Sequence, residues 1–192
     1  MRYPKDQKQA TRQRILEAAG RRFKQDGIDG AGVAAVMSDA GLTNGAFYAH
    51  FSSKEDLVAN VLAHQLRAQR QSVDAEPFGR AGLEAFIRAY LSPQHRDECA
   101  GGCPSAALLD EIARRPAATR QVYTAELLGI ADDIAARLDR TDADAARTDA
   151  LALFATMIGT LQLARALTDR DLSDQLLARG VKTALKLIDE AA

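Results

Sequence analysis

Apolar residues recur every three or four positions along most of the chain, which is the spacing of one face of an α-helix. In the first segment Ile15, Ala19 and Phe23 lie four apart and form one apolar stripe, and Gly27 then supplies a stop signal. No run shows the sustained alternation with β-branched residues that is typical of strands. The sequence therefore predicts an all-α fold of about nine helices.

Capping residues and prolines set several of the expected helix boundaries. Ser53, followed by two acidic residues, predicts a helix start, and apolar positions carry that helix to about Arg70. Pro104 fits the first turn of a helix, where its missing N–H costs nothing, and Ser173 is the expected N-cap of the last helix. Further helices are expected near residues 83–91, 104–115, 117–138, 143–168 and 173–191.

Two short helices before residue 54 are joined by a glycine-containing turn. Residues 33–40 form the first, Gly41 can take the left-handed conformation that a sharp turn requires, and Thr43 can cap the second. Such a pair makes a helix-turn-helix, whose second helix places its N-terminal residues against base edges in the DNA major groove. The alternative is two short core helices beneath a solvated surface.

The sequence that continues from this turn is more specific. Residues 45–54, Gly-Ala-Phe-Tyr-Ala-His-Phe-Ser-Ser-Lys, resemble the signature of the TetR family of transcriptional repressors, and residues 36–43 are similar to that family's second helix and turn. The motifs cover about residues 10–60, and the remainder is similar in architecture and length. The resemblance implies a helix-turn-helix DNA-binding domain at residues 1–55 and a helical effector-binding and dimerisation domain at residues 56–192.

The resemblance also assigns roles to individual residues. Thr43 would cap the recognition helix, three small or polar residues would face the bases, and three others would hold phosphates. These DNA-contact candidates are Thr43, then Asn44, Gly45 and Ala46 at the bases, and Tyr48, His50 and Lys54 at the phosphates. Phe47 and Phe51 match core positions. One departure is Gly32, which stands near where many members have a phosphate-binding Thr; Gly32 can still cap, but it offers no side-chain contact.

Charge is divided unevenly along the chain, although the net charge is only −1. Residues 1–54 hold nine Lys and Arg against five Asp and Glu, whereas the remainder holds 16 against 21. A basic head on an acidic body suits a protein whose N-terminal part binds a polyanion. Because the chain has no apolar stretch of membrane-spanning length, no signal peptide and only two Cys, we expect a soluble cytoplasmic protein with no membrane partner.

The C-terminal body is expected to dimerise and to bind an effector. Residues 143–167 carry two apolar stripes, so we expect one to face the core and the other to face a partner. The resemblance implies a homodimer through the last two long helices and an unidentified small-molecule effector. Core packing is the alternative role for each pocket candidate. These candidates are Phe86, Tyr90, Cys103, Leu109, Ile112, Tyr123, Leu127, Met157 and Leu161.

An enzyme is the competing class of function. His95, Cys99 and Cys103 are spaced like part of a soft-metal site, but only three ligands are visible and Gly101-Gly102 interrupts them. No nucleophile motif or phosphate-binding loop is present, so we expect no catalytic residue, metal or cofactor. Cys103, next to Pro104 at a helix start, is instead a candidate reactive thiol with Cys99 as its resolving partner; the alternative is a small buried apolar residue.

Overall fold

The computed structural model describes residues 3–138 and 140–190, and this part of the chain folds into ten helices with no strand. The all-α prediction is confirmed, with ten helices where about nine were expected. None of the helices in the described ranges has the length and apolarity needed to cross a membrane. In chain order the elements are α1 (Tyr3–Asp26), α2 (Val33–Asp39), the 3₁₀ helix η1 (Asn44–Ala49), α3 (Lys54–Asp74), α4 (Arg80–Tyr90), α5 (Pro93–Asp97), α6 (Pro104–Ala113), α7 (Ala117–Ala135), α8 (Ala143–Ala166) and α9 (Arg170–Glu190).

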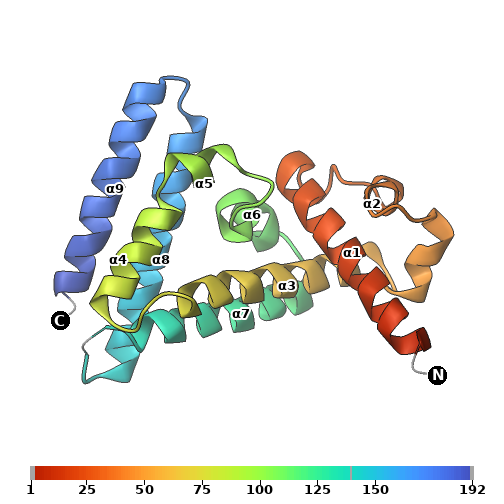
Figure 1. The fold of residues 1–192 in the computed structure, drawn as a ribbon, viewed down its shortest axis with the longest axis horizontal. Coiled ribbons are helices and arrows are strands. Elements are labelled where there is room, and N and C mark those ends of the chain that lie inside the picture. Colours follow the sequence, from red (N-terminus) through yellow and green to blue (C-terminus); the bar gives the residue numbers. More distant parts are fainter. Residues whose placement is uncertain (1–2, 139, 191–192) are drawn as a thin grey trace.

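The helices form a small head and a larger body (Figure 1). The head contains α1, α2 and η1, and the long helix α3 runs from it into the body, where it lies beside α7. Helices α8 and α9 pack side by side at the end of the body away from the head. Helix α6 contacts both α1 and α8, so it connects the head to the centre of the body.

Three kinds of local signal, a glycine, a capping serine and a proline, place turns and helix starts where the sequence predicted them. Gly27 follows α1 with φ +79°, and Gly41 lies in the turn after α2 with φ +66°, a region that favours glycine. Ser53 caps α3 by accepting a hydrogen bond from the Asp56 N–H at 3.0 Å. Pro104 occupies the first turn of α6.

The predicted start of the last helix was wrong. Ser173 lies inside α9, fully buried, and its hydroxyl donates to the Ala164 carbonyl of α8 at 2.7 Å. The start is instead fixed by Asp169, whose carboxylate accepts from the Leu172 N–H at 3.0 Å. The short helix α5 was not predicted; Ser92 caps it by accepting from the His95 N–H at 3.2 Å.

Helix α8 buries most of both predicted apolar stripes within the chain, and Leu151, Thr160 and Leu167 are half-buried. Phe154 and Leu161 from one stripe and Met157 from the other are all inaccessible to solvent or nearly so. The expectation that one stripe faces a partner was therefore wrong, because α8 packs against α5, α6 and α7 as well as against α9. Gly180 lets α9 approach α8 closely: a Cβ there would lie 2.4 Å from Thr160.

Candidate nucleic-acid interface

The helix-turn-helix is held together by a small aromatic and aliphatic core. Phe47 and Phe51 are buried with ring centroids 5.7 Å apart, and they join Val36 and Met37 of α2 in the same hydrophobic cluster. The turn is closed by a hydrogen bond from the Leu42 N–H to the Met37 carbonyl at 2.9 Å. Burial of these side chains fixes the orientation of η1 relative to α2.

The opposite side of η1 presents polar and small residues to solvent. Thr43, Asn44 and Gly45 are exposed, and Tyr48 is 77% exposed while its ring edge contacts Phe47 at a centroid separation of 5.2 Å. Ala46 is half-buried against the core, so less of it is available to a base than was expected. The segment is a 3₁₀ helix, and Thr43 makes no side-chain capping bond to it. Thr43 therefore stands at the predicted N-cap position, but its hydroxyl makes no capping bond and stays open to other partners.

His50 and Lys54 lie beyond the recognition segment and are both half-buried. The Lys54 ammonium donates to the Asp29 carbonyl oxygen at 3.2 Å and has no carboxylate partner among the residues described. Burial, followed by the positive charges of Lys8 and Arg12, lowers the pKa of His50. Its Nδ1 atom is buried without a hydrogen-bond partner in the described structure. The His50 ring therefore lies close to the positive charges of α1.

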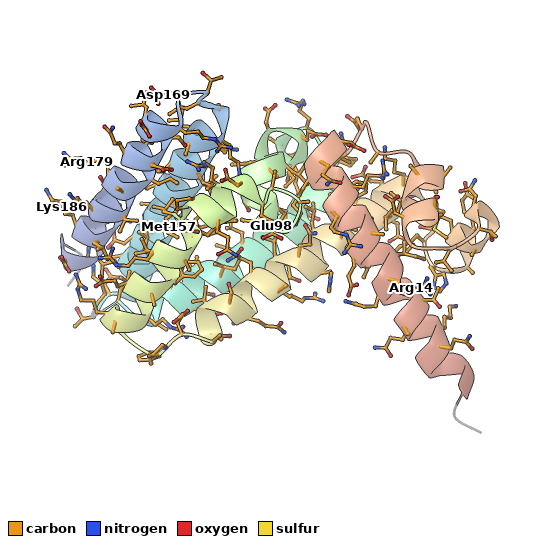
Figure 2. The ribbon with its side chains drawn as sticks, turned by 45° about the horizontal axis from the view of Figure 1, so that its top comes forward. Arg14, Glu98, Met157, Asp169, Arg179 and Lys186 are labelled. Carbon is orange, nitrogen blue, oxygen red and sulfur yellow. The ribbon has the colours of Figure 1, made fainter. Side chains whose placement is uncertain are left out.

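Arginines of α1 hold the head together, a role that the sequence did not indicate. The Arg12 guanidinium lies over the Phe51 ring at 4.9 Å from its centroid and donates to Asn60 of α3 at 2.6 Å. Arg14, labelled on α1 in Figure 2, donates to the Ala40 carbonyl at 2.5 Å, and Arg22 pairs with Asp39 at 2.5 Å. These contacts link residues far apart in sequence, so no local pattern could have revealed them.

The head meets the body where the C-terminal end of α1 approaches α6. Glu111 of α6 accepts a hydrogen bond from the Ile28 N–H at 2.8 Å, and Arg115 pairs with Asp29 at 2.7 Å. The Lys24 ammonium donates to the Gly102 carbonyl in the turn before α6 at 2.8 Å. We call these contacts the head–body junction; they connect the helix-turn-helix to the part of the body that lies nearest the pocket candidates.

The structure separates the effector-pocket candidates into different environments. Tyr123 donates to or accepts from Ser105 at 3.0 Å in the interior, and Leu127 is half-buried. Leu109 is 37% exposed on α6, so its assignment to an interior pocket was wrong. The remaining candidates are fully or almost fully buried; they are Phe86, Tyr90, Cys103, Ile112, Met157 and Leu161.

Three of the candidates, Phe86, Tyr90 and Cys103, line one cavity of about 220 Å³. The Tyr90 hydroxyl has no hydrogen-bond partner in the described structure, and burial raises its pKa well above the usual range. His95, which the sequence suggested only as a metal ligand, links two residues of this cavity through hydrogen bonds. Its Nδ1–H donates to the Tyr90 carbonyl at 2.7 Å and its Nε2 accepts from the Cys103 N–H at 3.1 Å.

These bonds leave neither nitrogen of His95 available to a metal. Cys99 is directed elsewhere, because its thiol contacts the Lys24 carbonyl at 3.5 Å. Across the described ranges, no group of three His, Cys, Asp or Glu side chains is placed to hold an ion. Both cysteines are free thiols, with Cys103 buried and Cys99 partly exposed.

Comparison with known proteins places this geometry in a family. Residues 15–61, which span the helix-turn-helix, match the family described as bacterial regulatory proteins, tetR family. The HTH-type transcriptional regulator TtgR of Pseudomonas putida is 32% identical over 106 residues, and the chain spans about half the length of that protein, 50%. The uncharacterized HTH-type transcriptional regulator TtgW of the same species is 34% identical over 90 residues, which cover 45% of this chain and 67% of that protein. The chain belongs to the TetR family of transcriptional regulators.

The TetR-family fold extends beyond the matched head. The reduced form of NemR from E. coli superposes with a TM-score of 0.77 over 91% of this chain and 95% of that chain, at 19% sequence identity. Identity this low establishes a shared fold and nothing about ligands. The body of this TetR-family chain is therefore built on the same helical plan.

Proposed function

We propose that the chain represses transcription by binding a palindromic DNA operator as a homodimer, and that a small-molecule effector releases it. The observation that carries the proposal is the recognition segment η1. Its aromatic residues Phe47 and Phe51 are buried, while Asn44, Gly45 and Tyr48 are exposed on the side away from the core. A polar, small-residue surface on a rigid helix-turn-helix suits close approach to base edges.

The proposed DNA contacts divide into two kinds. Asn44 and Gly45 are suited to face bases, since an Asn amide can pair with adenine and glycine lets the backbone come close. Tyr48 and Lys54 are suited to hold phosphates, because one presents a hydroxyl and the other an ammonium at the edge of the same surface. His50 is partly covered, so its contact would require the ring to turn or the phosphate to approach its exposed edge.

The proposed dimer uses the outer face of α8 together with α9. On α8 this face is lined by small residues that solvent reaches, including Ala155 and Gly159, with Leu163 61% exposed beside them. Leu172 of α9 is 49% exposed. Small side chains allow a second helix pair to pack closely, and a two-fold axis uses the same patch on both copies. Such a dimer presents two recognition segments to the two halves of a palindrome.

The proposed effector occupies the interior near Tyr90, where the unpartnered hydroxyl offers a hydrogen bond to a ligand. This position lies next to the Gly101–Gly102 turn, which also contacts Lys24 of α1. A ligand there can act on DNA binding by moving the head–body junction. Coupling of ~1–3 kcal/mol is typical of such systems and must be reciprocal, so operator DNA should weaken effector binding by the same factor.

The proposal is tested by selecting bound fragments from random duplex DNA with the purified protein. We expect the selected fragments to share an inverted repeat, and we expect the protein to sediment as a dimer both free and on one duplex. Asn44→Ala should change the selected sequence, since Asn44 is assigned to bases. Unrelated fragments with no common sequence, or one monomer per selected site, would contradict the proposal.

A further inference from the structure

Lys24 is a buried cation without an ionic partner. Its side chain leaves α1 and only 9% of the residue is exposed to solvent. The ammonium donates one hydrogen bond, to the Gly102 carbonyl at 2.8 Å, and no carboxylate pairs with it within the described ranges. Burial lowers its pKa to about 8. A charge withdrawn from water in this way is destabilising unless an opposite charge or further hydrogen bonds compensate it.

A cavity of about 400 Å³ opens beside this ammonium at the head–body junction. One wall comes from α1 with Arg21 and Lys24, another from α3 with His64 and Gln69, and the third from the turn before α6 with Gly102. The cavity adjoins the Tyr90 cavity: Gln69 and Ser72 of α3 and the Gly101–Gly102 turn line both, whereas Arg21, Lys24 and His64 line only this one. Its size is sufficient for a small organic molecule.

The surroundings of the cavity are positive. Arg21 forms no ion pair with any described residue, and its charge and that of Arg165 both lower the pKa of Lys24. Among the residues described, Arg165 is bonded only to backbone oxygens, including the His95 carbonyl at 2.8 Å. Glu17 is the single carboxylate in the lining; it is exposed and accepts a hydrogen bond from Gln13 at 2.9 Å. The thiols of Cys99 and Cys103 also lie near Lys24 and raise its pKa, His64 lines the cavity, and the Glu98 carboxylate lies against Gly101.

We propose that the junction cavity binds a small organic carboxylate, whose negative group pairs with Lys24 and Arg21 and whose remainder lies between α1, α3 and the Gly101–Gly102 turn. The site is distinct from the effector pocket proposed around Tyr90. A carboxylate supplies the counter-charge that Lys24 lacks, and a charge-assisted hydrogen bond is stronger than the present bond to a neutral carbonyl. A neutral ligand would leave both the buried cation and the exposed arginine at the mouth without a counter-charge.

The position of the cavity gives its ligand a route to DNA binding. Lys24 belongs to α1, which also carries Arg12 and Arg14 into the helix-turn-helix. A carboxylate that draws the ammonium away from Gly102 loosens one of the contacts that fix α1 to the body. We expect it therefore to lower affinity for operator DNA. The effect on DNA affinity rests on the proposed function, whereas binding of the carboxylate is independent of it.

The binding test uses acetate, benzoate and hexanoate as probes, without DNA. Each is titrated calorimetrically into the wild-type protein, Lys24→Met, Arg21→Gln and Lys186→Met, with benzamide as the neutral match to benzoate. Lys186 is an exposed lysine at the far end of α9 (Figure 2), so its variant controls for loss of one positive charge. Arg21 is also exposed, so its variant keeps the fold if Lys24→Met does not.

At least one carboxylate should bind saturably to wild type and to Lys186→Met. Its affinity for Lys24→Met and for Arg21→Gln should be lower by about tenfold or more. Benzamide should bind more weakly than benzoate, and the bound carboxylate should raise the Lys24 pKa above about 8 when it is followed by NMR. Failure of all three carboxylates to bind wild type, equal binding to both lysine variants, or equal binding of benzamide would overturn the proposal. Loss of specific DNA binding would overturn the proposed function instead.

Discussion

Lys24 should make the stability of the fold depend on pH in a way that a single substitution removes. In the unfolded chain its amine keeps the ordinary pKa of 10.5, whereas burial lowers the pKa in the native head–body junction to about 8. Between these two values the unfolded chain binds more protons than the native chain. The free energy of unfolding contributed by this group therefore rises as pH increases through that interval and is constant below it.

The expected size follows from the two pKa values. Each unit of difference corresponds to about 1.4 kcal/mol, so a shift from 10.5 to about 8 amounts to roughly 3 kcal/mol. Below about pH 8 the native chain carries this as the cost of a buried charge, set against the single hydrogen bond to Gly102. Lys24→Met removes both the charge and the bond, and it fills a similar volume with an apolar side chain.

The assay is urea unfolding of wild type and Lys24→Met at a series of pH values from 7 to 10.5, followed by circular dichroism. The difference in unfolding free energy, wild type minus variant, should rise by roughly 3 kcal/mol across the series, because groups that do not interact with Lys24 titrate equally in both proteins. Lys186→Met should give a flat difference, since that side chain is in water in both states. A flat difference for Lys24→Met as well would refute the account of a charged, uncompensated Lys24.

Three further predictions follow from burial and exposure. Phe47→Ala should lower the unfolding free energy by about 3–5 kcal/mol, whereas Tyr48→Ala should change it little, as measured by urea unfolding; equal losses would contradict the assigned sides of η1. Leu163→Arg should shift the protein from dimer to monomer in sedimentation, and an unchanged dimer would place the interface elsewhere. N-ethylmaleimide should modify Cys99 faster than buried Cys103 in mass spectrometry; the reverse order would favour the reactive-thiol hypothesis.

Features that depend on local backbone chemistry were predictable from the sequence. Gly41 was expected to adopt positive φ because the turn is sharp, and Ser53 and Pro104 were expected at helix starts because of what their side chains do to neighbouring N–H groups. The helix-turn-helix could be found for the same reason, since its helices, turn and core lie within about twenty consecutive residues. The surface that it presents then follows from which residues are apolar.

Features that depend on contacts between distant segments could not be predicted. Ser173 looked like a cap, but the approach of α9 to α8 gives its hydroxyl a buried partner at Ala164. Leu109 is apolar, as a pocket residue would be, yet it lies on the side of α6 that faces solvent. The burial of Lys24 could not be inferred from the sequence, because its partner Gly102 lies 78 residues away. In each case the packing of one helix on another decided the environment.

The measurement that tests the central claim most directly is competition for DNA at equilibrium. A labelled duplex carrying the selected inverted repeat is bound by the wild-type protein and then challenged with the unlabelled operator or with a shuffled duplex of the same composition. We predict that the operator competes at least about a thousandfold better than the shuffled duplex, and that Lys54→Ala weakens both and lowers the salt dependence by about one unit. Equal competition by the two duplexes would contradict the account of η1 as a segment that reads DNA sequence.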